Sequence, residues 1–138
     1  MKRIKYVSRY AKPFSQEELD QLAEQSAANN RELDVTGVLI TSGGIFFQVI
    51  EGPDDAIDGI FGAIEADPRH TDLVVLGIEE SATNRIFPDW SMKTVNLDAA
   101  SHVRLLPIKT LMQAVFDQQQ IIDQMIWTIE RTLKHELK

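Results

Sequence analysis

Cysteine is absent from this chain of 138 residues. Its absence excludes a disulfide framework, a cysteine-ligated zinc site and a thiol nucleophile, and it fits a reducing compartment, so we expect a cytoplasmic protein. Long apolar runs are missing too, because none approaches the roughly 20 residues that span a bilayer. Met1-Lys2-Arg3 leads directly into a strand-like stretch rather than into the apolar core of a signal peptide. We therefore expect no membrane association.

Positive charge is scarce as well. The chain has 14 Lys and Arg against 21 Asp and Glu, which gives a formal net charge of −7. This excess of negative charge argues against nucleic acid as a partner, because such binding depends on neutralising phosphates. Common enzyme signatures are absent, including the P-loop and the G-x-S-x-G, H-E-x-x-H and G-x-G-x-x-G motifs. The three histidines have no neighbours at metal-ligand spacing, so we predict no metal site.

Strand and helix patterns alternate along the first 97 residues. Ile4 and Tyr6 share one face of an alternating stretch, and Ser15 and Glu18 form a capping-box pattern at the start of a helix. The patterns predict strands over 3–9, 35–41, 45–50, 73–78 and 91–96, with helices over 16–28 and between Pro53 and Asp67. The order βαββαββ is typical of a ferredoxin-like α+β fold, in which two helices pack on one face of a mixed sheet.

The C-terminal part differs, so we divide the chain into a domain over 1–97 and a helical extension over 98–138. Apolar residues in the extension recur at alternating steps of three and four, which is the heptad pattern of a coiled coil. Gln119 is the one polar member of a seam that comprises Leu105, Ile108, Met112, Val115, Ile122, Ile126, Ile129 and Leu133. Two interpretations stay open: the seam forms a homodimer contact, or it packs on its own domain.

Polar side chains occupy positions where the strand pattern favours apolar ones. Tyr6 and Gln48 lie within predicted strands, and Asn30 follows the first predicted helix. A buried amide must find hydrogen-bond partners or destabilise the fold. A phenol and two amides on adjacent elements could surround a flat ligand with polar edges. The structural alternatives are core packing for Tyr6, a solvent-facing position for Gln48 and a helix cap for Asn30. For Trp90 and Met92, which alternate on the last predicted strand, the alternative is also core packing.

Five stretches stand in an order and spacing shared with a known family. They are Ile4–Ser8, Asn29-Asn30 with Val35–Leu39, Ile45–Gly52, Asp67–Thr71 and Arg85–Met92. Across these stretches, which span about residues 2–97, the chain resembles BLUF domains, the blue-light sensors that use flavin.

The resemblance implies a role for each matching residue. Tyr6 would donate an electron and a proton to the excited flavin, Gln48 would lie between Tyr6 and the flavin N5/O4 edge, and Asn30 would hold the carbonyl edge. Rearrangement of the Gln48 amide would exchange donor for acceptor at O4 and red-shift the absorption, with no covalent adduct. The resemblance places further residues around the flavin, namely Ser26, Asn29, Phe46, Ile64, Arg69, His70, Trp90 and Met92.

The resemblance also implies a cofactor and an output. FAD is the favoured flavin, with FMN and riboflavin as alternatives. Residues 96–98 and 104–111 resemble the linker after BLUF domains that control a nucleotide cyclase, yet the chain contains no cyclase domain. We therefore predict a photosensory module that is not itself an enzyme. It would form a homodimer through the C-terminal helix and act on an unknown effector domain or partner. A flavin-dependent redox enzyme and a small-molecule-binding regulatory domain remain alternatives.

Overall fold

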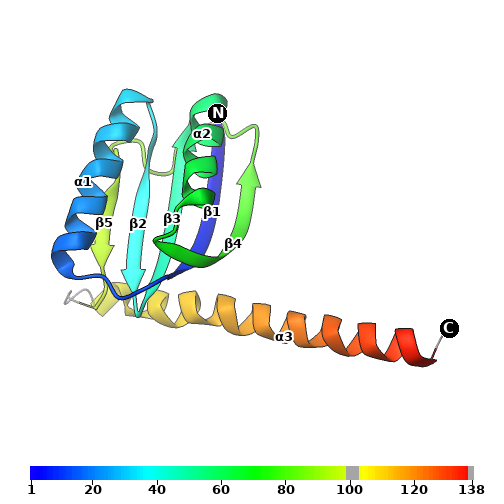
Figure 1. The fold of residues 1–138 in the computed structure, drawn as a ribbon. Helices are drawn as coiled ribbons and strands as arrows, with labels where there is room; N and C mark the ends of the chain where they lie inside the picture. The colour runs from blue at the N-terminus through cyan, green and yellow to red at the C-terminus, as the bar shows by residue number, and fades with distance from the viewer. Residues whose placement is uncertain (99–102, 137–138) are drawn as a thin grey trace.

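The computed structural model describes the backbone of residues 1–98 and 103–136, and Figure 1 shows its arrangement. One mixed sheet holds all the described strands in the order β4-β1-β3-β2-β5, and only the β2–β5 pair is parallel. The elements are β1 (Lys2–Tyr10), α1 (Gln16–Glu32), β2 (Thr36–Ser42), β3 (Ile45–Gly52), α2 (Asp54–Ala66), β4 (His70–Glu79), β5 (Lys93–Asn96), η1 (Val103–Leu105) and α3 (Leu106–Glu136). The predicted α+β class and element order are confirmed.

Helix α1 begins as the sequence predicts and ends later. The Ser15 hydroxyl accepts from the backbone N–H of Glu18 at 3.1 Å, and the Glu18 carboxylate accepts from the Ser15 N–H at 3.1 Å. This capping box fixes the first turn. The predicted end at Ala28 is wrong, because the helix continues to Glu32. Asn30, for which a helix cap was one alternative, lies inside its last turn together with Asn29.

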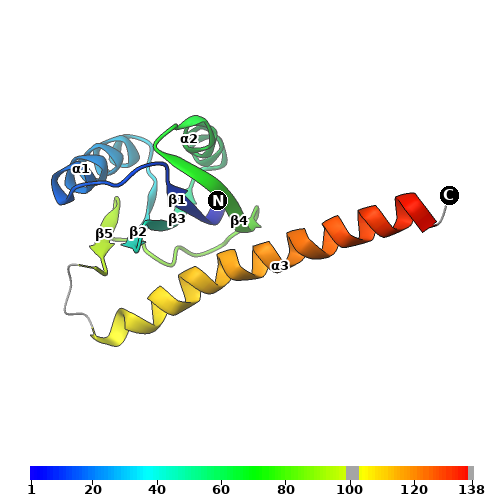
Figure 2. The same ribbon diagram turned by 60° about the horizontal axis from the view of Figure 1, so that its bottom comes forward.

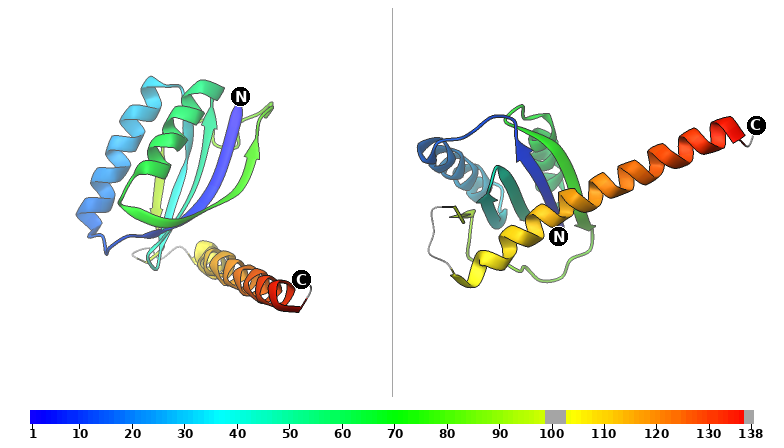
Figure 3. Two further views of the ribbon diagram at one scale, coloured as in Figure 1. Left: turned by 45° about the vertical axis from the view of Figure 1, so that its right-hand side comes forward. Right: turned by 90° about the horizontal axis from the view of Figure 1, so that it is seen from below.

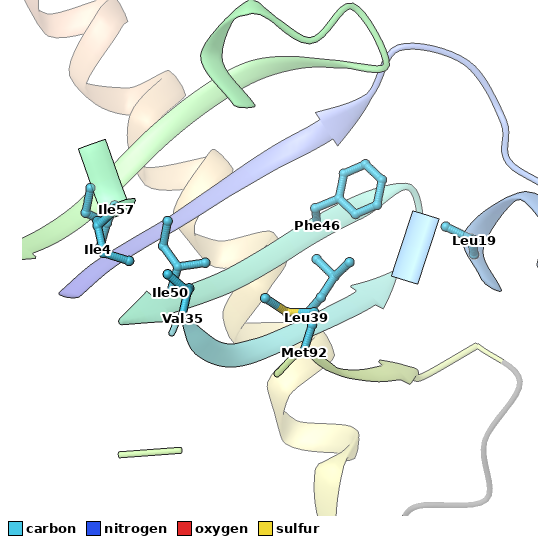
Figure 4. Packing of buried hydrophobic residues seen from close by; sticks show 8 residues of the cluster. All are labelled: Ile4, Leu19, Val35, Leu39, Phe46, Ile50, Ile57 and Met92. Carbon is cyan, nitrogen blue, oxygen red and sulfur yellow. The ribbon is translucent and has the colours of Figure 1, made fainter. Parts of the chain in front are cut away.

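The sheet is covered on its two faces by different helices. Figure 2 shows α1 and α2 on one side of the sheet and α3 on the other. The first face holds a buried cluster that Figure 4 shows in detail: Ile4, Leu19, Val35, Leu39, Phe46, Ile50, Ile57 and Met92. The second face holds Val7, Val38, Ile40, Ile45, Val49, Leu97, Met112 and Phe116. The predicted alternation of β1 thus separates two apolar cores.

The last strand is shorter than predicted. We expected it over 91–96, but β5 begins at Lys93, where it pairs with Val38 of β2. Trp90 and Met92 therefore precede the strand and do not alternate on it, which corrects their predicted setting. Strand β4 is longer than the predicted 73–78 and begins at His70.

The two halves of helix α3 differ in how the heptad seam is covered. Its first half lies on the sheet, where Met112 and Phe116 are buried. The guanidinium carbon of Arg9 lies 4.2 Å from the Phe116 ring centroid. The second half projects beyond the sheet (Figure 3). There Ile126 and Ile129 are 57% and 52% exposed. The division of the chain at residue 97 stays a prediction, and residues 99–102 and 137–138 of the extension lie outside the described residues.

Among the described residues, no helix is both long and apolar enough to cross a membrane.

Candidate functional site

A cavity of about 220 Å³ lies between α1, α2 and the face of the sheet that these helices cover. Four elements and the segment after α2 supply polar groups to it. The lining residues are Tyr6, Leu22, Gln25, Ser26, Asn29, Asn30, Leu39, Phe46, Gln48, Ile60, Ala63, Ile64, Asp67, Arg69 and His70. A cavity with an apolar lining and a few convergent polar groups is the usual form of a small-molecule site.

Tyr6 and Gln48 form a buried hydrogen-bonded pair at the floor of this cavity. They are register partners on β1 and β3, and the Tyr6 hydroxyl donates to Gln48 Oε1. Burial, aided by the negative charge of Asp67, raises the pKa of the Tyr6 phenol well above its ordinary value. Tyr6 is therefore neutral across the physiological range and keeps its proton for donation. Gln48 is buried and does not face solvent. Tyr6 is buried too, but it lines a cavity and donates a hydrogen bond in addition to packing in the core.

The Gln48 amide also contacts the residue just before β5. Its Nε2 donates to Met92 Sδ at 3.5 Å, and Met92 is 8% exposed. Thioether sulfur is a weak acceptor, so one N–H of Gln48 and a lone pair of Oε1 can still bond to a ligand. Trp90 lies elsewhere: it is 42% exposed and stacks on Phe87 at a centroid distance of 5.6 Å. In this structure Met92, rather than Trp90, is the neighbour of Gln48.

Asn30 connects the cavity to the segment before β5. Its side chain is buried, and Nδ2 donates to the carbonyl oxygen of Ser91 at 2.7 Å. The helix-capping interpretation is therefore wrong for the side chain, although the Asn30 backbone carbonyl does accept from Leu33 and Val35. Within the described part of the chain, the second N–H and the carbonyl of the amide have no such bond, so they can bond to a flat ligand.

Two lining residues after α2, Asp67 and Arg69, carry opposite charges. Arg69 Nε donates to both carboxylate oxygens of Asp67 at 2.9–3.0 Å, and this bond lowers the pKa of Asp67. His70 lies deeper, with its ring 6.3 Å from the Tyr6 ring and 6.4 Å from the Phe46 ring.

Nine of the eleven site residues that the resemblance implied line the cavity, and Trp90 and Met92 do not. Their roles in binding stay predictions. Sequence reasoning missed six lining residues: Leu22, Gln25, Leu39, Ile60, Ala63 and Asp67. Helical spacing would have found several of them, because Leu22, Gln25 and Asn29 share a face of α1 with Ser26. Within the described residues no group of His, Cys, Asp or Glu could hold a metal ion.

The fold and the cavity define a ligand-binding domain of the ferredoxin-like class. The chain belongs to the BLUF family, whose model, described as "Sensors of blue-light using FAD", matches residues 1–93. BLUF domains are blue-light sensors that bind flavin.

Named relatives and solved structures extend this similarity. The photoactivated adenylate cyclase subunit beta of Euglena gracilis is 38% identical over 101 residues, which are 72% of this chain and 12% of that protein. The structure of a bacterial light-regulated adenylyl cyclase matches with a TM-score of 0.81 and 36% identity over 89% of this chain and 36% of that one. The dark-state structure of BlrB, a BLUF protein, matches with a TM-score of 0.73 and 32% identity over 96% of both chains. This chain thus spans only a small part of the cyclase relatives and nearly all of BlrB.

The residues present fit a flavin. The isoalloxazine ring is flat, with carbonyl oxygens and N5 along one edge. Gln48 and Asn30 retain N–H donors toward the cavity, as their existing bonds leave capacity unused. Tyr6 and Gln48 are both buried, so a ring edge placed beside them would be shielded from water.

Proposed function

We propose that this chain binds FAD non-covalently and uses Tyr6 and Gln48 as its photochemical pair. The hydrogen bond from the Tyr6 hydroxyl to Gln48 Oε1, on the floor of the cavity, carries the proposal. The family description names FAD, which favours it over FMN or riboflavin. Ser26, Asn29 and Ile64 would line the ring, with Phe46, Arg69 and His70.

The proposed mechanism uses the chain's own groups. A bound flavin would supply blue-light absorption and accept an electron. Tyr6 would give up an electron and its phenolic proton, with Gln48 Oε1 as the first acceptor of that proton. Both would return to Tyr6, so the cycle has no net chemistry. The lasting change would be a rearranged Gln48 amide that bonds differently to the flavin O4 edge and so red-shifts the absorption.

A rearranged Gln48 would change its contact with Met92, the residue just before β5. Strand β5 ends at Asn96, and the next residue, Leu97, packs in the same cluster as Met112 and Phe116 of α3. The signal would therefore pass from Gln48 through β5 to the docked half of α3. Trp90, which stacks outside the cavity, would change its surroundings along with Met92.

Helix α3 would carry the output. Its second half exposes Ile122, Ile126, Ile129 and Leu133, which form one stripe at heptad spacing. A monomer rarely exposes such a stripe, so we propose a homodimer through this half. The chain would be a cytoplasmic photosensory module without catalysis of its own, acting on an effector domain or a partner protein.

The test is the absorption spectrum of the purified protein before and after blue light. A yellow protein whose absorption shifts reversibly to the red supports the proposal. Bleaching without a red shift would favour a flavin-dependent redox enzyme. A colourless protein that takes up no added flavin would favour a regulatory domain for another small molecule.

A further inference from the structure

A buried carboxylate holds the segment that connects β4 to β5. Glu51, near the end of β3, has a fully buried side chain. Its Oε1 accepts from the backbone N–H of Phe87 at 2.6 Å, and its Oε2 accepts from the backbone N–H of Ile86 at 3.0 Å. Two consecutive backbone N–H groups thus donate to one carboxylate. These bonds fix the middle of the connection between β4 and β5, which has no helix or strand of its own.

Arg3 neutralises this carboxylate. Arg3 Nε donates to Glu51 Oε2 at 2.8 Å, and Nη1 donates to Glu79 Oε2 at 2.6 Å. Nη2 donates to the carbonyl oxygen of Asn84, two residues before Ile86. A buried charge requires such a partner, because an unpaired one strongly destabilises the fold. The pair therefore binds the same segment at three backbone groups: Asn84, Ile86 and Phe87.

Arg85 ties the segment to β2 from its outer side. Its Nη1 donates to Thr36 Oγ1 at 2.8 Å, and its Nη2 donates to the carbonyl oxygen of Asp34 at 2.9 Å. Arg85 Nη1 also reaches the backbone carbonyl of Glu51 at 3.3 Å. The segment is held between β1, β3 and the entry to β2.

The residues that follow this anchor lead to the cavity. Phe87 stacks on Trp90, and the Trp90 carbonyl accepts from the N–H of Gly37 at 2.8 Å. The next carbonyl, of Ser91, accepts from Asn30 Nδ2, and Met92 then accepts from Gln48. The anchor at Ile86 and Phe87 therefore sets where the chain enters the contact with Gln48.

We propose that Glu51 is a positioning residue of the photocycle. It fixes the backbone at Ile86 and Phe87, and through them the place to which Met92 returns beside Gln48 after light. The inference rests on the proposed function. Without the two bonds from Glu51 to the backbone, the segment can hold Met92 in several places. Met92 then regains its dark-state contact with Gln48 less often, so thermal return to the dark state slows.

The test is Glu51→Gln. Glutamine keeps the shape but removes the charge, and it places an NH₂ group against a backbone N–H or against Arg3. The expected result is a flavin content and a red-shift amplitude close to wild type, with dark recovery slowed by about fivefold or more, the factor for a modest loss of hydrogen-bond free energy. A Trp127→Phe background leaves Trp90 as the sole tryptophan. Its fluorescence should be quenched more readily by acrylamide in Glu51→Gln, because the segment is no longer fixed.

Glu79→Gln is the matched control. It removes a partner of Arg3 at the half-exposed end of the network and leaves the Glu51 bonds to Ile86 and Phe87 in place. Its recovery should stay within about twofold of wild type, because Arg3 keeps its buried partner Glu51 and Glu51 keeps its two backbone donors.

Arg85→Met provides a second variant, because it removes the bonds of the same segment to Thr36 and Asp34 and leaves the Arg3–Glu51 pair in place. Slower recovery in Arg85→Met supports the inference even where Glu51→Gln does not fold. Recovery at or above the wild-type rate in the variants that fold overturns it, and so does equal slowing in Glu79→Gln. If wild type itself shows no red shift, the proposed function fails and the inference fails with it.

Discussion

The phenol of Tyr6 donates its hydrogen bond across two paired strands to the side-chain carbonyl of Gln48. Both residues are buried, and the other end of the Gln48 amide contacts Met92. One amide therefore joins the proposed electron donor to the segment that leads into β5. The predictions below depend on this pair, on Asn30 and on the projecting half of α3.

Tyr6→Phe should keep flavin bound and abolish the photocycle. Phenylalanine fills the space of the buried ring but has no phenolic electron and proton to donate. The measurement is the light-minus-dark absorption spectrum of the flavin-loaded variant. Tyr10→Phe is the control, because Tyr10 lies on the same strand but does not line the cavity. A red shift of wild-type size in Tyr6→Phe would contradict the assignment.

The buried phenol of Tyr6 should also make the fold sensitive to alkali. Burial raises the pKa of Tyr6 in the folded protein, whereas the unfolded chain has the ordinary value of about 10. The folded state therefore binds more protons above that pH. The contribution of Tyr6 to stability is fully present below about pH 10 and is lost as pH rises toward the raised pKa.

Denaturant unfolding between about pH 9 and 11.5 measures this effect. Tyr6→Phe should lose stability less steeply than wild type as the pH rises. The loss of stability with pH in Tyr10→Phe should lie between those of wild type and Tyr6→Phe, because Tyr10 is only half-buried and its pKa is raised as well. Identical slopes for wild type and Tyr6→Phe would show that the phenol is not held neutral by the fold.

Asn30→Ala should weaken flavin retention more than a change at Tyr6. Alanine removes the amide groups that face the cavity, and it also frees the Ser91 carbonyl from its bond. Losing buried hydrogen bonds of this kind costs roughly 1–3 kcal/mol. Flavin content after extensive dialysis measures the loss. Gln21→Ala is the control and should keep the wild-type flavin content, since Gln21 is exposed on the same helix and does not line the cavity. Full flavin content in Asn30→Ala would contradict a role of Asn30 in flavin binding and leave it only its structural bond to Ser91.

The projecting half of α3 should hold a homodimer together. Ile126→Asp with Ile129→Asp places two charges in the exposed stripe and should yield monomers in sedimentation analysis. Colour and red shift should survive, because these residues do not line the cavity. Gln120→Asp with Gln124→Asp adds the same charge on the opposite side of the helix and should leave the dimer intact. A wild-type monomer at tens of micromolar would contradict the proposal.

Much of the fold was predictable because its signals are local. The alternation of β1 and the capping box at Ser15 depend on neighbouring residues alone. The place of the Asn30 side chain was not predictable, because Asn30 donates its hydrogen bond to the carbonyl oxygen of Ser91, which lies far along the chain. The prediction that Trp90 and Met92 alternate on a strand was wrong for a similar reason. Their segment is held by Glu51, which no local pattern connects to it.

The extension shows where pattern alone leaves a choice. Heptad spacing runs through Met112 and Ile126 alike, yet Met112 is buried on the sheet and Ile126 is exposed. Phe116, which lies off the seam, is also buried. Heptad spacing predicts which residues share a face of the helix. Whether the sheet covers that face depends on how far the sheet extends along the helix.

The most direct test of the central claim compares the light-minus-dark absorption spectra of wild type and Gln48→Leu, both loaded with FAD. Leucine is similar in size to glutamine but cannot exchange hydrogen bonds, so it should bind flavin, absorb to the blue of wild type in the dark and show no red shift after light. Wild type should shift reversibly to the red under the same illumination. A normal red shift in Gln48→Leu would contradict the account, because some group other than the Gln48 amide would then do the switching.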